Sequence, residues 1–374
     1  MSGSHRTPTR GRFALSRRAK IVAAGTTAAL VGAAFGYFAF FPEQAPAFVR
    51  SAVRGAMESV GIADDPPPVC PLTGEERTEE VPARPALGIK VENAPESRPQ
   101  AALNEADVVL EEPVEGGYTR FIAIFQCGES DRVGPVRSGR ATDPDYLRQL
   151  GPAVFGYSGA VAAVGREVPK AGLVGVNFDH QPEAFTRDPN RSAPHDIFTS
   201  TAALWDVGAD AAEADDREPA DAPEPVFAFS ETWEGRSRRL PQIGLPYSSV
   251  SDVVWRWARR QGAWLRSHGD VPHTLEDGTQ VSATNVVIQV VEVTDSAIVD
   301  AAGNASPDVE LTGSGRAYVL RDGRMIPGRW ERENLDEVTR FVTRDGEEIT
   351  LAPGRTWVEL LPSPIEIVFP EPVA

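Results

Sequence analysis

The stretch from Glu92 to Asp143 contains three polar clusters, namely ENAPESRPQ at 92–100, EEPVEGGYTR at 111–120 and GPVRSGR at 134–140. Apolar runs at 108–110 and 121–125 lie between these clusters. Short apolar runs bounded by turn residues are typical of buried strands, and the loops that follow strands often carry function. The pattern therefore predicts a sheet whose strand ends bring ionisable side chains to one place.

The charge of the chain is unevenly distributed. The 374 residues carry a formal net charge of −17. Six of the 37 basic residues and none of the 54 acidic ones lie in residues 1–20, so the remainder carries 31 basic and 54 acidic groups, a net charge of −23. Binding to nucleic acid relies on a basic surface that neutralises phosphates. We therefore expect no nucleic-acid partner.

Residues 21–41 contain no charged side chain. A run of about 20 apolar residues is long enough to cross a bilayer, and the basic residues before it predict a cytoplasmic N-terminus. A cleaved signal peptide is the alternative, because Ala45-Pro46-Ala47 has small residues at the spacing of a cleavage site. The length of the run and its aromatic end favour an uncleaved anchor. The expected location is the cell membrane, with a single pass and the bulk of the chain extracytoplasmic.

Cys70 and Cys127 are the two cysteines, and both follow this apolar run. An oxidising compartment permits a disulfide between them, which would contribute roughly 4 kcal/mol by loop-entropy arithmetic. Two unpaired buried thiols are the alternative.

The order of expected elements predicts an α+β protein. Strands are expected at 85–91, 107–110, 118–126, 154–157 and 173–178, and helices at 142–150, 160–168 and 200–212. The first helix should be capped by Thr142 or Asp143, and the last near Ser200 or Thr201. Asp-Gly pairs at 277–278, 322–323 and 345–346 then predict tight hairpin turns. A mixed α/β N-terminal domain should thus precede a mainly antiparallel β C-terminal domain.

These features give an expected division of the chain into seven segments. They are a basic cytoplasmic tail (1–20), a transmembrane anchor (21–41), a stem (42–69), the N-terminal domain (70–208), an acidic linker or loop (209–225), the C-terminal domain (226–362) and a tail (363–374).

The motif Arg137-Ser138-Gly139-Arg140 precedes an expected helix. Guanidinium groups, free backbone N–H groups and a helix start together suit an anion. Arg120 and Arg98 are candidates to join this site, which gives the predicted ligand-binding residues Arg98, Arg120, Arg137, Ser138 and Arg140. The alternative is a buried ion network, in which the arginines pair with Glu111, Glu112, Glu115 and Asp143.

Catalytic signals are weaker. Glu112, Glu115 and His195 are candidates for acid–base chemistry, although His195 is more simply interpreted as a residue that braces its loop. Two cysteines are too few for a cysteine metal site, and the sequence contains neither a zinc-type histidine spacing nor a Gly-Lys phosphate loop. No metal or cofactor is therefore expected, and enzymatic activity stays an open alternative.

Several of these motifs occur together in a known family. They are PLTG at 71–74, Glu92-Asn93, RPQ at 98–100, residues 103–107, 114–120 and 134–140, and Ala193-Pro194-His195. The combination resembles the YerB-like family of bacterial envelope lipoproteins, a family of unknown function, over residues 70–362. The resemblance implies a two-domain, membrane-tethered extracytoplasmic protein and supplies no reaction. One departure is that no cysteine stands just after the apolar run for lipid attachment.

The leading functional prediction is an envelope protein that binds an anionic cell-wall or peptide ligand through Arg120, Arg137 and Arg140. The alternatives are a hydrolase of envelope polymers that uses Glu112 or Glu115 with His195, and a scaffold that recruits protein partners through its stem and its acidic segment.

Overall fold

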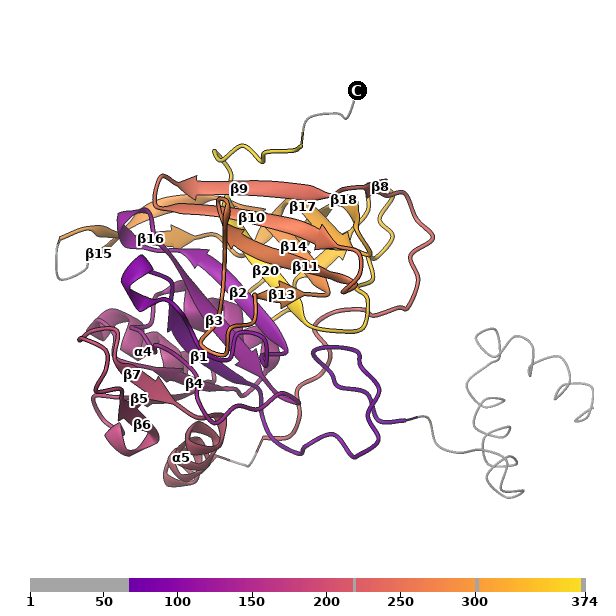
Figure 1. Ribbon diagram of the computed structural model, residues 1–374. Coiled ribbons are helices and arrows are strands. Elements are labelled where there is room, and N and C mark those ends of the chain that lie inside the picture. Colours follow the sequence, from indigo (N-terminus) through magenta and orange to yellow (C-terminus); the bar gives the residue numbers. More distant parts are fainter. Residues whose placement is uncertain (1–66, 218–219, 300–302, 371–374) are drawn as a thin grey trace, which may run out of the picture. The chain divides into compact units, whose positions relative to one another are not determined.

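The computed structural model describes residues 67–217, 220–299 and 303–370 (Figure 1). The predicted tail at 1–20, anchor at 21–41 and most of the stem lie outside the described residues. Within the described ranges, no helix combines the length and the apolar character needed to cross a membrane.

An 11-stranded mixed sheet contains strands from both halves of the sequence. Its strands are β1 (Leu87–Glu92), β2 (Val108–Pro113), β3 (Thr119–Phe125), β4 (Val154–Tyr157), β5 (Val174–Asn177), β8 (Arg238–Arg239), β14 (Asn285–Val291), β17 (Gly313–Arg321), β18 (Arg324–Arg332), β19 (Arg340–Val342) and β20 (Thr356–Pro362). The order is β19-β18-β17-β14-β20-β2-β3-β1-β4-β5, and β8 pairs with β18.

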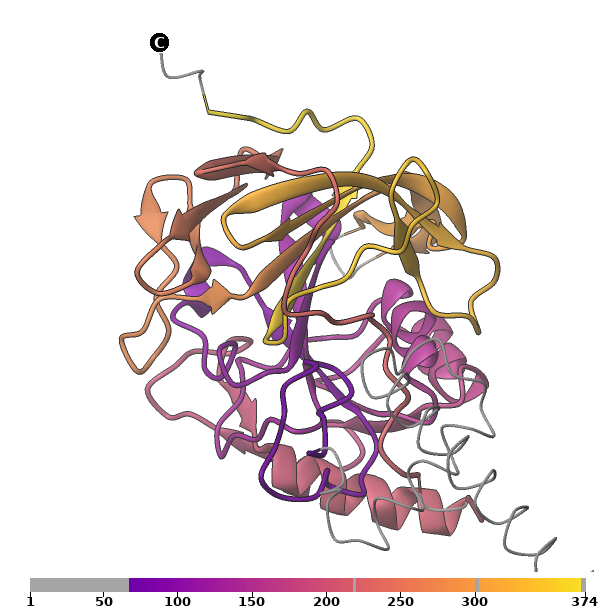
Figure 2. The same ribbon diagram turned by 90° about the vertical axis from the view of Figure 1, so that its right-hand side faces the viewer.

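Strand β20 joins the two halves of the sequence. It pairs in parallel with β14 on one side and with β2 on the other, so that Trp357 lies opposite both Val286 and Val109. The indigo to purple and yellow strands accordingly run side by side in Figures 1 and 2. The other strand pairs within the C-terminal half are antiparallel, as expected, and the pairings of β20 are the parallel exceptions. The division into two domains at 209–225 stays a prediction, although the sheet is continuous between the two halves.

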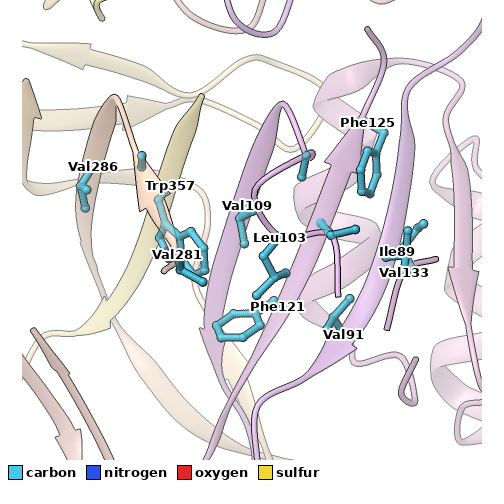
Figure 3. Packing of buried hydrophobic residues seen from close by; sticks show 14 of the residues in the cluster. Ile89, Val91, Leu103, Val109, Phe121, Phe125, Val133, Val281, Val286 and Trp357 are labelled. Carbon is cyan, nitrogen blue, oxygen red and sulfur yellow. The ribbon is translucent and has the colours of Figure 1, made fainter. Parts of the chain in front are cut away.

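A second, five-stranded sheet packs on one face of the large one. Trp255 in this sheet meets Trp357 edge to face with ring centroids 5.3 Å apart. The rings of Phe121 and Trp357, both labelled in Figure 3, have centroids 5.2 Å apart. The central strands β2, β3, β14 and β20 are buried along almost their whole length because both faces of the sheet are covered. The second sheet consists of β9 (Gln242–Ser248), β10 (Ser251–Ala258), β11 (Ala263–His268), β12 (Val271–Pro272) and β13 (Ser282–Ala283).

Three α-helices lie within the described residues: α3 (Thr142–Leu147), α4 (Ala162–Lys170) and α5 (Thr201–Ala214). The Oγ atom of Ser200 caps α5 by accepting a hydrogen bond from the Ala203 N–H at 3.1 Å, as predicted. Helix α3 has no side-chain cap, which corrects the prediction for Thr142 or Asp143. Helix α5 extends into the predicted acidic linker, and the fold as a whole is mainly β with a mixed sheet.

Two short ribbons and one disulfide complete the described structure. The ribbons are β6 (Phe185–Arg187) with β7 (Ile197–Thr199), and β15 (Val293–Val299) with β16 (Ala305–Val309). Cys70 and Cys127 form the predicted disulfide, which attaches the segment before β1 to the end of β3. Asp322 and Gly323 form the predicted tight turn between β17 and β18, both with positive φ.

Candidate functional site

A pocket of about 770 Å³ lies where four parallel strands end. Strands β1, β2, β4 and β5 run in the same direction, and β3 runs antiparallel between β1 and β2. Ligands of open α/β sheets bind outside the carboxyl ends of parallel strands. The residues that line the pocket follow this rule, because most of them end β1, follow β2, β4 and β5, or begin β3. They are Glu92, Ala94, Glu96, Val114, Glu115, Gly116, Tyr118, Thr119, Arg120, Arg137, Ser138, Arg140, Ser158, Gly159, Ala160, Val161, Phe178, Asp179, Arg187, Ile197, Asn304 and Ser306.

The C-terminal half of the chain also contributes to the pocket. Ser306 on β16 donates a hydrogen bond to the Oε1 atom of Glu115, which lies in the short 3₁₀ helix η3 (Glu115–Gly117) after β2. The β15–β16 ribbon, which is labelled in Figure 1, therefore contributes to the pocket lining. Any ligand that fills the pocket would contact both halves of the sequence.

Arg137 is neutralised by Glu92, the last residue of β1. The Arg137 Nε atom lies 2.9 Å from Glu92 Oε1, and the His195 Nδ1 atom lies 2.7 Å from Glu92 Oε2. Glu92 is buried, and both of its oxygens have protein partners. His195 thus braces its loop against the pocket wall and does not itself line the pocket.

Arg140 is neutralised by Glu115. Its Nε and Nη2 atoms lie 2.9 Å and 2.7 Å from Glu115 Oε2. Burial alone would raise the pKa of Glu115, but hydrogen bonds from Arg140 and Ser306 outweigh it and lower the pKa below its ordinary value. Glu115 is therefore ionised at neutral pH and is not a proton donor.

Arg120 differs from both of these arginines. It lies on β3 directly opposite Glu92 on β1 and Glu112 on β2, yet no carboxylate in the described part of the chain comes within ion-pair distance of its guanidinium. Its Nη1 atom donates to the Ser138 carbonyl at 3.2 Å. The residue is only 9% exposed. Burial, followed by repulsion from Arg140 and Arg137, lowers the pKa of Arg120 to about 10, so it remains a cation at neutral pH.

Glu112 does not line the pocket and is fully buried. Its Oε1 atom accepts from the Lys90 ammonium group, which also contacts Asp143 Oδ1 at 2.6 Å. Asp143 Oδ2 in turn accepts from the Arg140 backbone N–H at 2.6 Å, so the cluster supports the loop that carries Arg140. Burial raises the pKa of Glu112 to about 7, against the lowering effect of Lys90.

Arg98 lies apart from the other predicted ligand-binding residues. Its Nη2 atom donates to the Asn93 carbonyl at 2.8 Å, and its side chain does not line the pocket. Burial, followed by repulsion from Arg266, lowers the pKa of Arg98 to about 10. The structure therefore brings together Arg120, Arg137, Ser138 and Arg140 and leaves Arg98 out.

The predicted alternative of a buried ion network describes part of this arrangement. Arg140 does pair with Glu115, and Arg137 pairs with an acid that was not in the predicted set, Glu92. The pocket nevertheless remains open, with Arg120 in its wall. Asp179 also lines the pocket and was missed as a site residue. Its position directly after a predicted strand was a usable signal, because ends of parallel strands meet.

No group of three or more His, Cys, Asp and Glu side chains within residues 67–370, gaps excepted, is arranged to hold a metal ion. The lining of the pocket offers guanidinium, carboxylate and hydroxyl groups next to the apolar side chains of Val161, Phe178 and Ile197.

Fold and pocket together define a mainly β protein with an arginine-containing pocket at the carboxyl ends of parallel strands. Residues 72–215 match the N-terminal domain, and residues 243–358 the C-terminal domain, of the family described as "Protein of unknown function (DUF3048)". The chain belongs to this family, which confirms the resemblance seen in its motifs.

Two comparisons with Bacillus subtilis agree with this assignment. The chain is 28% identical over 301 residues to the protein of strain 168 named "Putative lipoprotein YerB", an alignment that covers 78% of this chain and 86% of the relative. It is also similar to the crystal structure of the YerB protein, with a TM-score of 0.68, 25% identity, and coverage of 80% of this chain and 99% of that one.

Proposed function

We propose that this is an envelope protein whose pocket binds an anionic ligand at Arg120. The observation that carries the proposal is the difference between Arg120 and its neighbours. Arg137 and Arg140 each have a carboxylate partner, whereas Arg120 is buried in the pocket wall and donates to a backbone carbonyl. A carboxylate or phosphate group in the pocket would supply the missing counter-charge.

The energetics favour such a ligand. A guanidinium group binds planar anions through charge-assisted hydrogen bonds, which are stronger than neutral ones. Arg120 has lost most of its hydration and is repelled by two neighbouring arginines. An anion bound there would offset both effects, and the open space beside Arg120 leaves room for it.

The location at a membrane is part of the same proposal. The uncharged run at 21–41 supports a single-pass anchor, and the name of the Bacillus relative supports attachment to a membrane. The Cys70–Cys127 disulfide is in keeping with an oxidising, extracytoplasmic compartment. We therefore place the pocket outside the cytoplasm, where cell-wall and peptide carboxylates are available.

The hydrolase alternative has less support from the geometry. Glu115 is ionised by its contacts with Arg140 and Ser306, and Glu112 is sealed beneath the pocket. Neither is placed to donate a proton to a ligand in the pocket. Binding is therefore the function that the arrangement of side chains supports best.

Isothermal titration calorimetry on the full-length protein in non-ionic detergent tests this proposal. The probes are inorganic phosphate and N-acetyl-alanyl-alanine, which has a carboxylate and no amine. We expect Arg120→Met to weaken binding of the better probe at least tenfold. The matched control is Arg166→Met, which removes an exposed arginine on α4 that does not line the pocket and should not change binding. Equal affinity of Arg120→Met and the unmodified protein, or no binding of either probe, would overturn the proposal.

A further inference from the structure

The charges around the pocket do not describe a simple anion site. Its lining contains four arginines and four acidic residues, namely Arg120, Arg137, Arg140, Arg187, Glu92, Glu96, Glu115 and Asp179. A ligand with only negative charge would meet attraction from one set and repulsion from the other. The pairing of these groups decides which charges remain available.

Three of the four arginines have carboxylate partners. Arg137 pairs with Glu92 and Arg140 pairs with Glu115, as described above. Arg187 pairs with Asp196 at 2.6 Å and lies over the ring of Phe178, with its Cζ atom 4.8 Å from the ring centroid. Arg187 is thus engaged by Asp196, and no ion pair joins it to Asp179 within the described structure.

One cationic and two anionic groups are left. Arg120 is the remaining cation, and Asp179 and Glu96 are exposed carboxylates without an ion-pair partner among the described residues. Asp179 follows β5 and lies close to the chain at Gly159. A Cβ atom added to Gly159 would come 2.7 Å from Asp179 Oδ2, so this carboxylate lies against the backbone of Gly159 in the pocket wall.

We infer that the ligand is a zwitterion, an amino acid or a short peptide, whose carboxylate contacts Arg120 and whose ammonium group contacts Asp179. This inference rests on the proposed binding of an anion at Arg120. The apolar side chains of Phe178, Ile197 and Val161 line the same pocket and suit the aliphatic part of such a molecule. An ammonium group converts repulsion from Asp179 into attraction, which gives selectivity over a plain anion.

Three peptides that differ only at their termini test the inference in calorimetric titrations of the full-length protein. They are alanyl-alanine, N-acetyl-alanyl-alanine and alanyl-alanine amide. We expect alanyl-alanine to bind at least tenfold more tightly than either blocked form. In Asp179→Asn, the ratio between alanyl-alanine and the acetylated peptide should fall to about one. Glu183→Gln, which changes an exposed acid outside the pocket, is the matched control and should keep the ratio.

The outcomes separate this inference from the proposed function. Equal affinity for the free and acetylated peptides in the unmodified protein would overturn the zwitterion and leave anion binding in place. If the ratio of the two affinities fell to about one in Glu96→Gln and kept its original value in Asp179→Asn, the assignment of the ammonium group to Asp179 would be wrong. No binding of either carboxylate-bearing peptide would overturn the zwitterion, and failure of inorganic phosphate to bind as well would overturn both proposals. Thermal unfolding of each variant identifies any loss of fold.

Discussion

The guanidinium of Arg266 on β11 and the carboxylate of Glu111 on β2 form a fully buried pair that joins the two sheets. Arg266 Nη2 lies 2.8 Å from Glu111 Oε1, and Arg266 Nε lies 3.1 Å from Glu111 Oε2. Glu359 lies opposite Glu111 on β20, and burial, followed by repulsion from Glu111, holds the pKa of Glu359 well above its ordinary value. Tyr247 and Trp255 of the second sheet donate hydrogen bonds to Glu359, and Arg266 supplies the positive charge of this contact between the sheets.

Removal of that cation should destabilise the fold strongly. We expect Arg266→Met to lower the free energy of unfolding by about 3–5 kcal/mol, because it leaves Glu111 buried without a counter-charge. The double variant Arg266→Met with Glu111→Gln should recover part of this loss. Urea denaturation measures both. Lys170→Met, which breaks an exposed pair with Glu167, should cost less than about 1 kcal/mol. If Arg266→Met and Lys170→Met lowered the free energy of unfolding by similar amounts, the buried pair would not be critical for stability.

His273 should remain neutral across physiological pH. Arginine can only donate, so Arg266 Nη1 donates to His273 Nδ1 at 2.8 Å, and the proton of the ring lies on Nε2, which donates to Gln100 Oε1 at 2.9 Å. Burial, followed by repulsion from Arg266, holds the pKa of His273 well below its ordinary value. NMR of the imidazole nitrogens should show this tautomer without titration between about pH 5 and 8. A titration midpoint near the ordinary histidine pKa of about 6.5 would be incompatible with the network.

Glu112 should make stability depend on pH. Its pKa is raised from an ordinary value of 4.5 to about 7 in the folded protein, chiefly by burial. Between these values the native state holds a proton that the unfolded state has lost, so this group's contribution to stability decreases as pH rises from about 4.5 to 7. Glu112→Gln removes the titration. Other carboxyl groups titrate in both proteins, so the quantity to measure is the difference in unfolding free energy between them.

As pH rises from about 4.5 to 7, Glu112→Gln should become more stable relative to the unmodified protein. Urea denaturation at several pH values provides the measurement. A pH-independent difference would mean that Glu112 is already ionised throughout, with Lys90 and not burial controlling its pKa.

The strands around the pocket were predictable because their signals are local. The apolar runs of β2 and β3, the Ser200 cap of α5 and the Asp322-Gly323 turn are each specified by a few neighbouring residues. The same local patterns placed Arg120 in the strand that became β3, and Arg137 and Arg140 just before the helix that became α3.

Contacts between distant segments were not predictable in this way. The parallel pairing of β20 with β2 joins residues far apart in the chain, and the sequence of a strand does not specify which other strand pairs with it. Arg137 pairs with Glu92, and Arg98 donates to the carbonyl of Asn93. Both contacts depend on side-chain directions that are set only in the assembled fold. The absence of a carboxylate within ion-pair distance of Arg120, among the described residues, was unpredictable because it too depends on side-chain directions.

A crystal structure of the protein with N-acetyl-alanyl-alanine bound tests the central claim most directly. The account predicts the peptide carboxylate about 3 Å from the guanidinium of Arg120, with the Arg137–Glu92 and Arg140–Glu115 pairs unchanged. A structure in which Arg120 instead pairs with Glu92 or Glu115, and the peptide lies elsewhere, would contradict it.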